Sequence, residues 1–97
     1  MSEKRSDSRI TVMMRVELLW QDGAGTAHIT TGTLEDKSRE GASVRVKEPI
    51  PTGAKLIIQG QRDHFSGTVV YCREDSSRHD RYVLGIQREP IHSPNPT

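Results

Sequence analysis

The segment from Thr11 to Trp20 alternates between apolar and polar side chains, and this period of two limits the possible folds most strongly. Met13 and Leu19 are the exceptions on the polar face. Because successive side chains of an extended chain point to opposite sides, the pattern predicts a β-strand with one buried face. The Asp22-Gly23 pair that follows is a strong signal for a hairpin turn. The expected buried face carries Val12, Met14, Val16, Leu18 and Trp20.

Five more short strand patterns follow, and no segment has a strong helical period. Gly32 interrupts the second strand, so we expect a bulge or bend there. The third strand should bury Ala42, Val44 and Val46, because they alternate with polar residues. These short strands predict an all-β fold, a closed or nearly closed six-stranded antiparallel barrel with little or no helix. The other four expected strands are 26–34, 55–59, 64–72 and 82–87.

The connections between the later strands also have recognisable compositions. Two prolines in the segment Glu48 to Gly53 remove backbone donors, which predicts a loop rather than a central strand. The charged segment from Arg73 to Arg81 is likewise expected to be a loop. In the strand between these loops we expect Phe65, Val69 and Tyr71 to share the buried face.

Length and composition exclude several classes of protein. The 97 residues, of which 32% are hydrophobic and only four are Phe, Trp or Tyr, fit one domain with a thin core. A net charge of +1 argues against binding nucleic acid mainly by bulk electrostatics. Cys72 is the single cysteine, so an intrachain disulfide is excluded. Without an apolar run of transmembrane length or a signal-peptide core, we expect a cytoplasmic protein with no membrane partner, or a cytoplasmic domain of a longer one.

Two groups of polar residues have spacings that suit a guanine nucleotide. Arg5 and Arg9 form an R-x-x-x-R pair, whose planar guanidinium groups match phosphate oxygens and the O6/N7 edge of guanine. Asp36, Ser38 and Gly41 stand at offsets 0, 2 and 5 between two expected strands. In an extended chain residues i and i+2 face the same side, so the carboxylate and hydroxyl could together accept the N1–H and N2–H₂ donors of guanine. Gly41 allows a close backbone approach that a side chain would block.

In order and spacing these groups resemble the PilZ domain, the bacterial receptor module for cyclic di-GMP. The segments Gly67-Thr68-Val69-Val70 and Tyr82 to Ile86 resemble the last two strands of that family, and the match extends from about Lys4 to about Gln87. The resemblance implies a six-stranded barrel with cyclic di-GMP as its ligand. The chain departs from the family at Lys37, where an apolar residue is usual, and its proline-rich tail replaces the C-terminal helix of many members.

The resemblance also assigns roles to individual residues. Arg5 and Arg9 are expected to hold phosphate and guanine, Asp36 and Ser38 to hold guanine, and Gly41 to keep the surface open. Two further ligand-binding candidates come from the residues themselves. Lys4 could be a third cation for two stacked nucleotides, or it could be a solvated lysine in the arm. Arg39 could face the ligand, or it could be an ordinary exposed loop arginine.

These expectations define a non-enzymatic cyclic di-GMP receptor with a ligand-binding arm at residues 1–10, a barrel at 11–88 and a disordered tail at 89–97. Nucleotide binding would fold a mobile arm over the barrel, and a partner protein or fused domain would read the change. The alternative is a ligand-free PilZ-like interaction module. Single-stranded nucleic-acid binding is disfavoured because it needs exposed aromatic residues. The four histidines lack metal-ligand spacing and no hydrolase motif is present, so we expect no metal, cofactor or catalytic residue.

Overall fold

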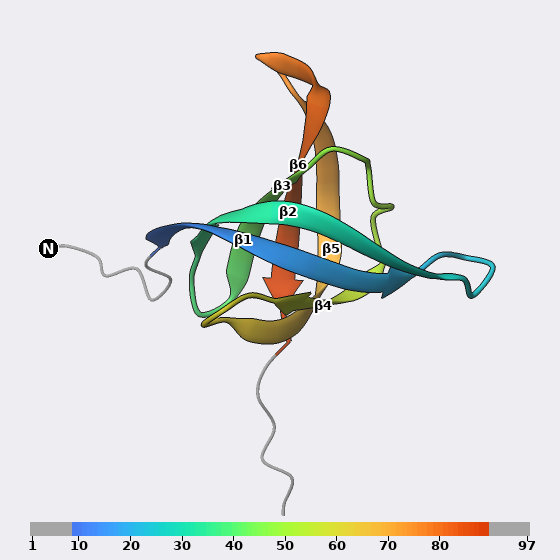
Figure 1. Cartoon of the computed structure of the whole chain (residues 1–97), viewed down its shortest axis with the longest axis horizontal. Coiled ribbons are helices and arrows are strands. Elements are labelled where there is room, and N and C mark those ends of the chain that lie inside the picture. The colour runs from blue at the N-terminus through green and yellow to red at the C-terminus, as the bar shows by residue number, and fades with distance from the viewer. Residues whose placement is uncertain (1–8, 90–97) are drawn as a thin grey trace, which may run out of the picture.

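The computed structural model describes residues 9–89, except for the side chains of residues 78 and 79. This part of the chain contains no helix, and therefore no helix that could cross a membrane. Its strands form one closed antiparallel barrel in the order β1-β2-β3-β6-β5-β4 (Figure 1), which confirms the predicted six-stranded fold. The strands are β1 (Ile10–Gln21), β2 (Ala27–Lys37), β3 (Gly41–Val46), β4 (Lys55–Gln59), β5 (His64–Asp75) and β6 (Arg78–Arg88).

Strand β1 closes the barrel because it pairs with two neighbours. It pairs with β2 along almost its whole length, and its second half, from Glu17 to Trp20, also pairs with β4. The predicted alternation is present, since Val16 and Leu18 are buried while Arg15 and Glu17 are exposed. A single long strand with one apolar face therefore supplies two of the six ladders of the sheet.

The core fills the inside of the barrel with side chains from all six strands and one loop. Ile50 comes from the proline-containing β3–β4 loop and is completely buried, so this loop covers part of the core. Burial of such a side chain contributes about 1.5–3 kcal/mol. The buried apolar residues are Val16, Leu18, Leu34, Ala42, Val44, Val46, Ile50, Leu56, Ile58, Val69, Leu84 and Ile86.

The bulges of the sheet do not occur at Gly32, as the sequence predicted. Gly32 pairs regularly with both neighbouring strands. It is a site of close approach instead, because a Cβ atom there would lie 2.7 Å from the carbonyl oxygen of Arg45. The register of β1 against β2 shifts between Thr11 and Met14, where Met13 adopts a φ of +53°. The register of β2 against β3 shifts at Glu35, one residue before Asp36.

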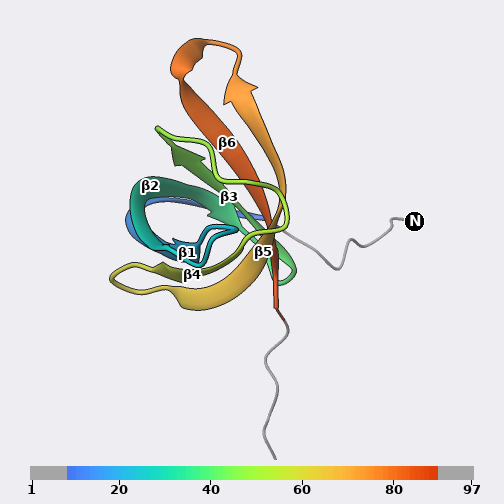
Figure 2. The ribbon, with the colours of Figure 1, turned by 90° about the vertical axis from the view of Figure 1, so that its right-hand side faces the viewer.

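The segment from Arg73 to Arg81 is not a loop, which corrects the second sequence-based expectation. Strands β5 and β6 continue through it and form a ribbon that projects beyond the barrel (Figure 2). A two-stranded ribbon exposed on both sides requires no apolar alternation, so its charged sequence carried no strand signal. Figure 1 shows the same ribbon in orange above the barrel.

Tyr71 does not share the buried face of β5 with Val69, which corrects a third expectation. The register of β5 shifts between Val69 and Tyr71, and this bulge brings Tyr71 to the outside of the barrel, where it is 42% exposed. Its ring lies over Gly85 of β6, so close that a Cβ atom on Gly85 would be 2.1 Å from it. The guanidinium of Arg73 lies 5.6 Å from the centre of the same ring.

Candidate functional site

The bulge at Glu35 determines which way Asp36 faces. Leu34 is completely buried, so in a regular strand Asp36, two residues later, would also point into the barrel. The extra residue reverses this alternation. Asp36 pairs with Thr11 of β1 and Ser43 of β3, both on the outer surface. The carboxylate therefore lies outside the barrel.

Arg9 lies immediately before β1 and contacts this carboxylate. Its Nη1 donates to Oδ1 of Asp36 in an ion pair. Both side chains remain partly exposed, at 48% for Arg9 and 30% for Asp36. Arg9 of the R-x-x-x-R pair and Asp36 of the D-x-S-x-x-G turn, far apart in sequence, thus meet at the outer surface where β1 begins and β2 ends.

Ser38 is only 4% exposed, and its hydroxyl is engaged in the turn between β2 and β3. The amide N–H of Gly41 donates to Oγ of Ser38 at 3.0 Å, and the amide of Ser38 donates to the carbonyl of Gly41 at 2.8 Å. The sequence-based argument placed Ser38 beside Asp36 on one side of an extended chain. Strand β2 ends at Lys37, so that rule does not extend to Ser38.

Gly41 begins β3 at the point where Arg9, the turn and β6 come together. A Cβ atom at this position would lie 3.2 Å from the carbonyl oxygen of Ile86 and 3.6 Å from Nη2 of Arg9. It would also be 3.9 Å from Oγ of Ser38. The backbone φ of Gly41 is not in the left-handed region, so the glycine is required for close approach and not for its backbone conformation.

Arg88, the last residue of β6, belongs to the same cluster and was not identified from the sequence. Its Nη1 donates to the carbonyl of Ser38 at 2.7 Å, and its backbone amide donates to the carbonyl of Glu40 at 2.8 Å. No motif marks this arginine, and the expected sixth strand stopped one residue before it. Only the pairing of β3 with β6 brings it to the turn.

Lys37 explains how the chain accommodates a charged residue where the resembling family usually has an apolar one. Its Nζ forms an ion pair with the carboxylate of Asp63 in the β4–β5 turn. The Asp63 side chain is only 10% exposed. This pair connects the residue next to Asp36 to the opposite side of the barrel, so the turn is held from β4–β5 as well as from β6.

The remaining candidates make no contact with this cluster that the structure describes, or fall outside the described residues. Lys4 and Arg5 fall in residues 1–8, outside the part of the chain that the structure describes, so their assignment stays a prediction. The division into an arm at 1–10, a barrel at 11–88 and a tail at 89–97 depends on such residues and also stays a prediction. Arg39 is exposed in the turn. Trp20 lies at the other end of β1, where its ring stacks on His28 at 4.5 Å and its Nε1 donates to Thr30.

Comparison with known families identifies the family of the chain. A family model described as the PilZ domain matches residues 3–95. The chain belongs to the PilZ family. The matched residues include both the R-x-x-x-R pair and the D-x-S-x-x-G turn. A search of curated proteins finds no match.

Solved structures support the PilZ fold. K. pneumoniae MrkH, determined as a complex with cyclic di-GMP, has a TM-score of 0.67 and 13% identity over 94% of this chain. This chain spans 47% of that protein. The PilZ domain of YcgR from Escherichia coli, also determined with cyclic di-GMP, has a TM-score of 0.63 and 15% identity over 95% of this chain and 82% of that one. At identities of 13% and 15%, these two comparisons show that the barrel fold is shared.

Proposed function

We propose that this PilZ chain is a non-enzymatic receptor for cyclic di-GMP. Membership of the PilZ family and the cyclic di-GMP complexes of MrkH and YcgR support the proposal. The single observation that carries it is the cluster of Arg9, Asp36 and Gly41 on the outer surface of the barrel. The resemblance assigns ligand contacts to these residues, and Arg9 from one motif lies against Asp36 and near Gly41 from the other.

The chemistry of the cluster suits a guanine nucleotide. The partly exposed carboxylate of Asp36 can accept hydrogen bonds from N1–H and N2–H₂ of guanine. Arg9 can donate to a phosphate or to O6/N7 of the second base, and its guanidinium plane can stack on a purine. Gly41 leaves the backbone open to the flat face of the base. Charge-assisted hydrogen bonds of this kind contribute about 1.5–3 kcal/mol each.

The arm supplies the remaining contacts and the conformational response. Arg5 precedes Arg9 by four residues, a span of at most about 13 Å in an extended chain. We propose that Arg5 contacts a second phosphate of the same compact ligand while Arg9 contacts the first or a guanine. The nucleotide favours the arrangement in which the arm covers it, and this differential affinity supplies the signal to a partner. The proposal includes a cytoplasmic location for this receptor.

Titration calorimetry tests the proposal directly. Cyclic di-GMP is titrated into the wild-type chain and the variants Arg9→Ala and Asp36→Ala, with GMP as the comparison nucleotide. Arg15→Ala is the matched control, because Arg15 is an exposed β1 arginine on the outer surface away from the turn. We expect saturable binding by wild type and Arg15→Ala, and at least about tenfold weaker binding by the other two. The proposal is wrong if wild type gives no binding heat and no thermal shift.

The stoichiometry of the same titration tests the role of Lys4. Two nucleotides per chain are expected if Lys4 helps to compensate the four phosphate charges of a stacked pair. One nucleotide per chain rejects that role and leaves the proposed receptor function intact.

A second candidate function is a ligand-free interaction module, and an exposed apolar row favours it. Leu19 of β1 pairs directly with Ile29 of β2 and with Ile57 of β4, so the three side chains lie side by side on the outer surface. Ile29 is 67% exposed and Ile57 41%. This candidate replaces the first if the chain binds no nucleotide and the double variant Ile29→Ser/Ile57→Ser abolishes its association with a partner protein.

A further inference from the structure

Arg88 connects the end of β6 to both sides of the turn that precedes Gly41. Its backbone N–H donates to the carbonyl of Glu40 at 2.8 Å, as an extension of the β3–β6 ladder. Its side chain crosses to the start of the turn, where Nη1 donates to the carbonyl of Ser38 at 2.7 Å. One residue therefore holds the turn at two carbonyl groups. Any residue except proline could make the backbone bond, but the bond to Ser38 depends on the Arg88 side chain.

The Arg88 guanidinium lies over the ring of Phe65. The central carbon of the guanidinium lies 4.3 Å from the centre of the Phe65 ring. Phe65 is half-buried and packs against the core, so the ring is a fixed support. A guanidinium can stack by its face while its edge donates a hydrogen bond, which an ammonium group cannot do. Arg88 is thus oriented toward Ser38 by the barrel itself.

The bond to Ser38 acts on the two residues that the proposed ligand would touch. Ser38 follows Asp36 by two residues, and its hydroxyl accepts the amide N–H of Gly41. A shift of the Ser38 peptide would therefore move Asp36 relative to Arg9 and disturb the surface at Gly41. None of the ion pairs found among residues 9–89 includes Arg88. Its side chain is therefore oriented mainly by the Ser38 carbonyl and the Phe65 ring.

We propose that Arg88 is a positioning residue of the nucleotide site, holding the D-x-S-x-x-G turn in the geometry that binds guanine. The inference rests on the proposed function, because its principal readout is the affinity for cyclic di-GMP. It goes beyond the two family motifs, since Arg88 lies 50 residues from Ser38 and belongs to neither. A positioning role requires both the planar stack and the directed hydrogen bond, so lysine is an inadequate substitute.

Calorimetric titration of cyclic di-GMP into Arg88→Gln, Arg88→Lys and Phe65→Leu tests this role. Arg73→Gln is the matched control, because Arg73 also lies over an aromatic ring but on the projecting ribbon. We expect at least about tenfold weaker binding by both Arg88 variants, a smaller loss for Phe65→Leu, and unchanged binding by Arg73→Gln. Circular dichroism verifies that each variant is folded at the titration temperature. Wild-type affinity in folded Arg88→Gln overturns the inference alone, whereas failure of wild type to bind overturns the proposed function as well.

Amide hydrogen exchange at Gly41, measured without nucleotide, separates positioning from a purely electrostatic role. If Arg88 holds the turn, the Gly41 amide exchanges faster in Arg88→Gln and in Arg88→Lys than in wild type. If Arg88 only attracts phosphate, exchange at Gly41 is unchanged and Arg88→Lys keeps its affinity, and that result contradicts the proposal.

Discussion

Arg9 and Asp36, separated by 27 positions in the sequence, form an ion pair on the outer surface of the barrel. The pair exists because β1 and β2 are antiparallel neighbours and because the bulge at Glu35 turns Asp36 outward. Exposed pairs of this kind contribute only about 0.2–1 kcal/mol to folding. Arg9 and Asp36 are therefore available to a ligand at little cost to the stability of the barrel.

A double-mutant cycle should show that Arg9 and Asp36 act together on the ligand. We expect Arg9→Ala and Asp36→Ala each to weaken cyclic di-GMP binding about tenfold or more, and the double variant to lose less than the product of the two. Their free energies of unfolding should stay within about 1 kcal/mol of wild type, because the pair is exposed. Calorimetry and urea denaturation measure the two quantities. Strictly multiplicative losses in affinity would contradict a shared site.

Replacement of Gly41 by alanine should reduce affinity because the site has little room for a side chain. The added Cβ would lie 3.2 Å from the carbonyl of Ile86 and 3.6 Å from Nη2 of Arg9. We expect a cost in stability of about 1 kcal/mol and a weaker complex with cyclic di-GMP. Gly23→Ala is the control, since no atom lies within 4 Å of a Cβ there. Equal affinities for the two variants would show that Gly41 does not border the ligand.

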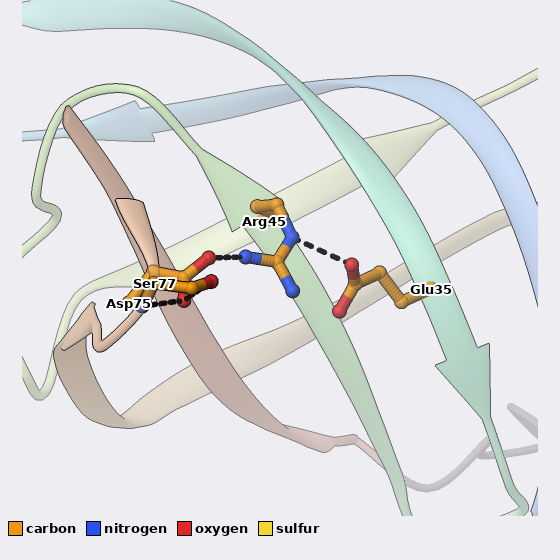
Figure 3. Close-up of polar contacts among 4 residues, drawn as sticks. All are labelled: Glu35, Arg45, Asp75 and Ser77. Carbon is orange, nitrogen blue, oxygen red and sulfur yellow. Dashed lines mark hydrogen bonds and ion pairs between the residues drawn. The ribbon is translucent and has the colours of Figure 1, made fainter. Parts of the chain in front are cut away.

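The ribbon is connected to the barrel by charged groups, and this connection should make stability depend on pH. Figure 3 shows Arg45 between Glu35 and Asp75, with Ser77 bonded to the same Asp75 carboxylate. Hydrogen bonds from the backbone and hydroxyl of Ser77 lower the pKa of Asp75 below its ordinary value of 3.8, and the charge of Arg45 lowers it further. The hydrogen bond with Glu35 acts in the other direction on Arg45 and raises the pKa of its guanidinium.

The sign of this pH dependence follows from proton binding. In the pH range between the lowered pKa and the ordinary one, the unfolded chain binds more protons at Asp75 than the folded chain. The stabilisation is therefore present above about pH 4 and is lost as the pH falls through the folded pKa of Asp75. Urea denaturation at a series of pH values should show a smaller acid-induced loss in Asp75→Asn than in wild type. An unchanged pH profile in that variant would exclude Asp75 as the source.

Gly85 and Tyr71 should behave as a coupled pair. A Cβ atom on Gly85 would lie 2.1 Å from the Tyr71 ring, so Gly85→Ala must displace the ring from the sheet. We expect a loss of about 1–3 kcal/mol in Gly85→Ala, and less than the sum of the single losses in Gly85→Ala/Tyr71→Ala. Thermal and urea unfolding measure the coupling, and additive losses would show that the ring does not depend on Gly85.

The pair of Lys37 and Asp63 should matter for stability more than the pair of Arg9 and Asp36. In Lys37→Met the Asp63 carboxylate, only 10% exposed, would lose its partner. We expect a loss of about 1–3 kcal/mol, part of which is recovered in Lys37→Met/Asp63→Leu because both charges are then removed. Lys47→Met, at an exposed position after β3, serves as the control and should leave stability unchanged. A loss in the double variant larger than in Lys37→Met would contradict this account.

Local patterns were sufficient to predict that six strands exist and which residue types the candidate site contains. The alternation of Val16 and Leu18 with charged neighbours, and the prolines around Ile50, report directly on which residues face a core and where a strand cannot continue. The same reasoning failed for the charged ribbon and for Tyr71. A solvated two-stranded ribbon needs no buried face, and a bulge reverses the alternation beyond it without any signal in composition.

The sequence by itself determined that this chain forms a barrel and that it carries arginine, aspartate, serine and glycine at the spacings of a PilZ domain. Only the tertiary structure decided how these residues are used. The bulge at Glu35 turned Asp36 outward, and the end of β2 at Lys37 left the Ser38 hydroxyl to the turn. The pairing of β3 with β6 brought Arg88 to the Ser38 carbonyl from 50 residues away. Such contacts depend on strand register over the whole sheet, and a local sequence pattern records which face a residue occupies but not which distant residue lies opposite it.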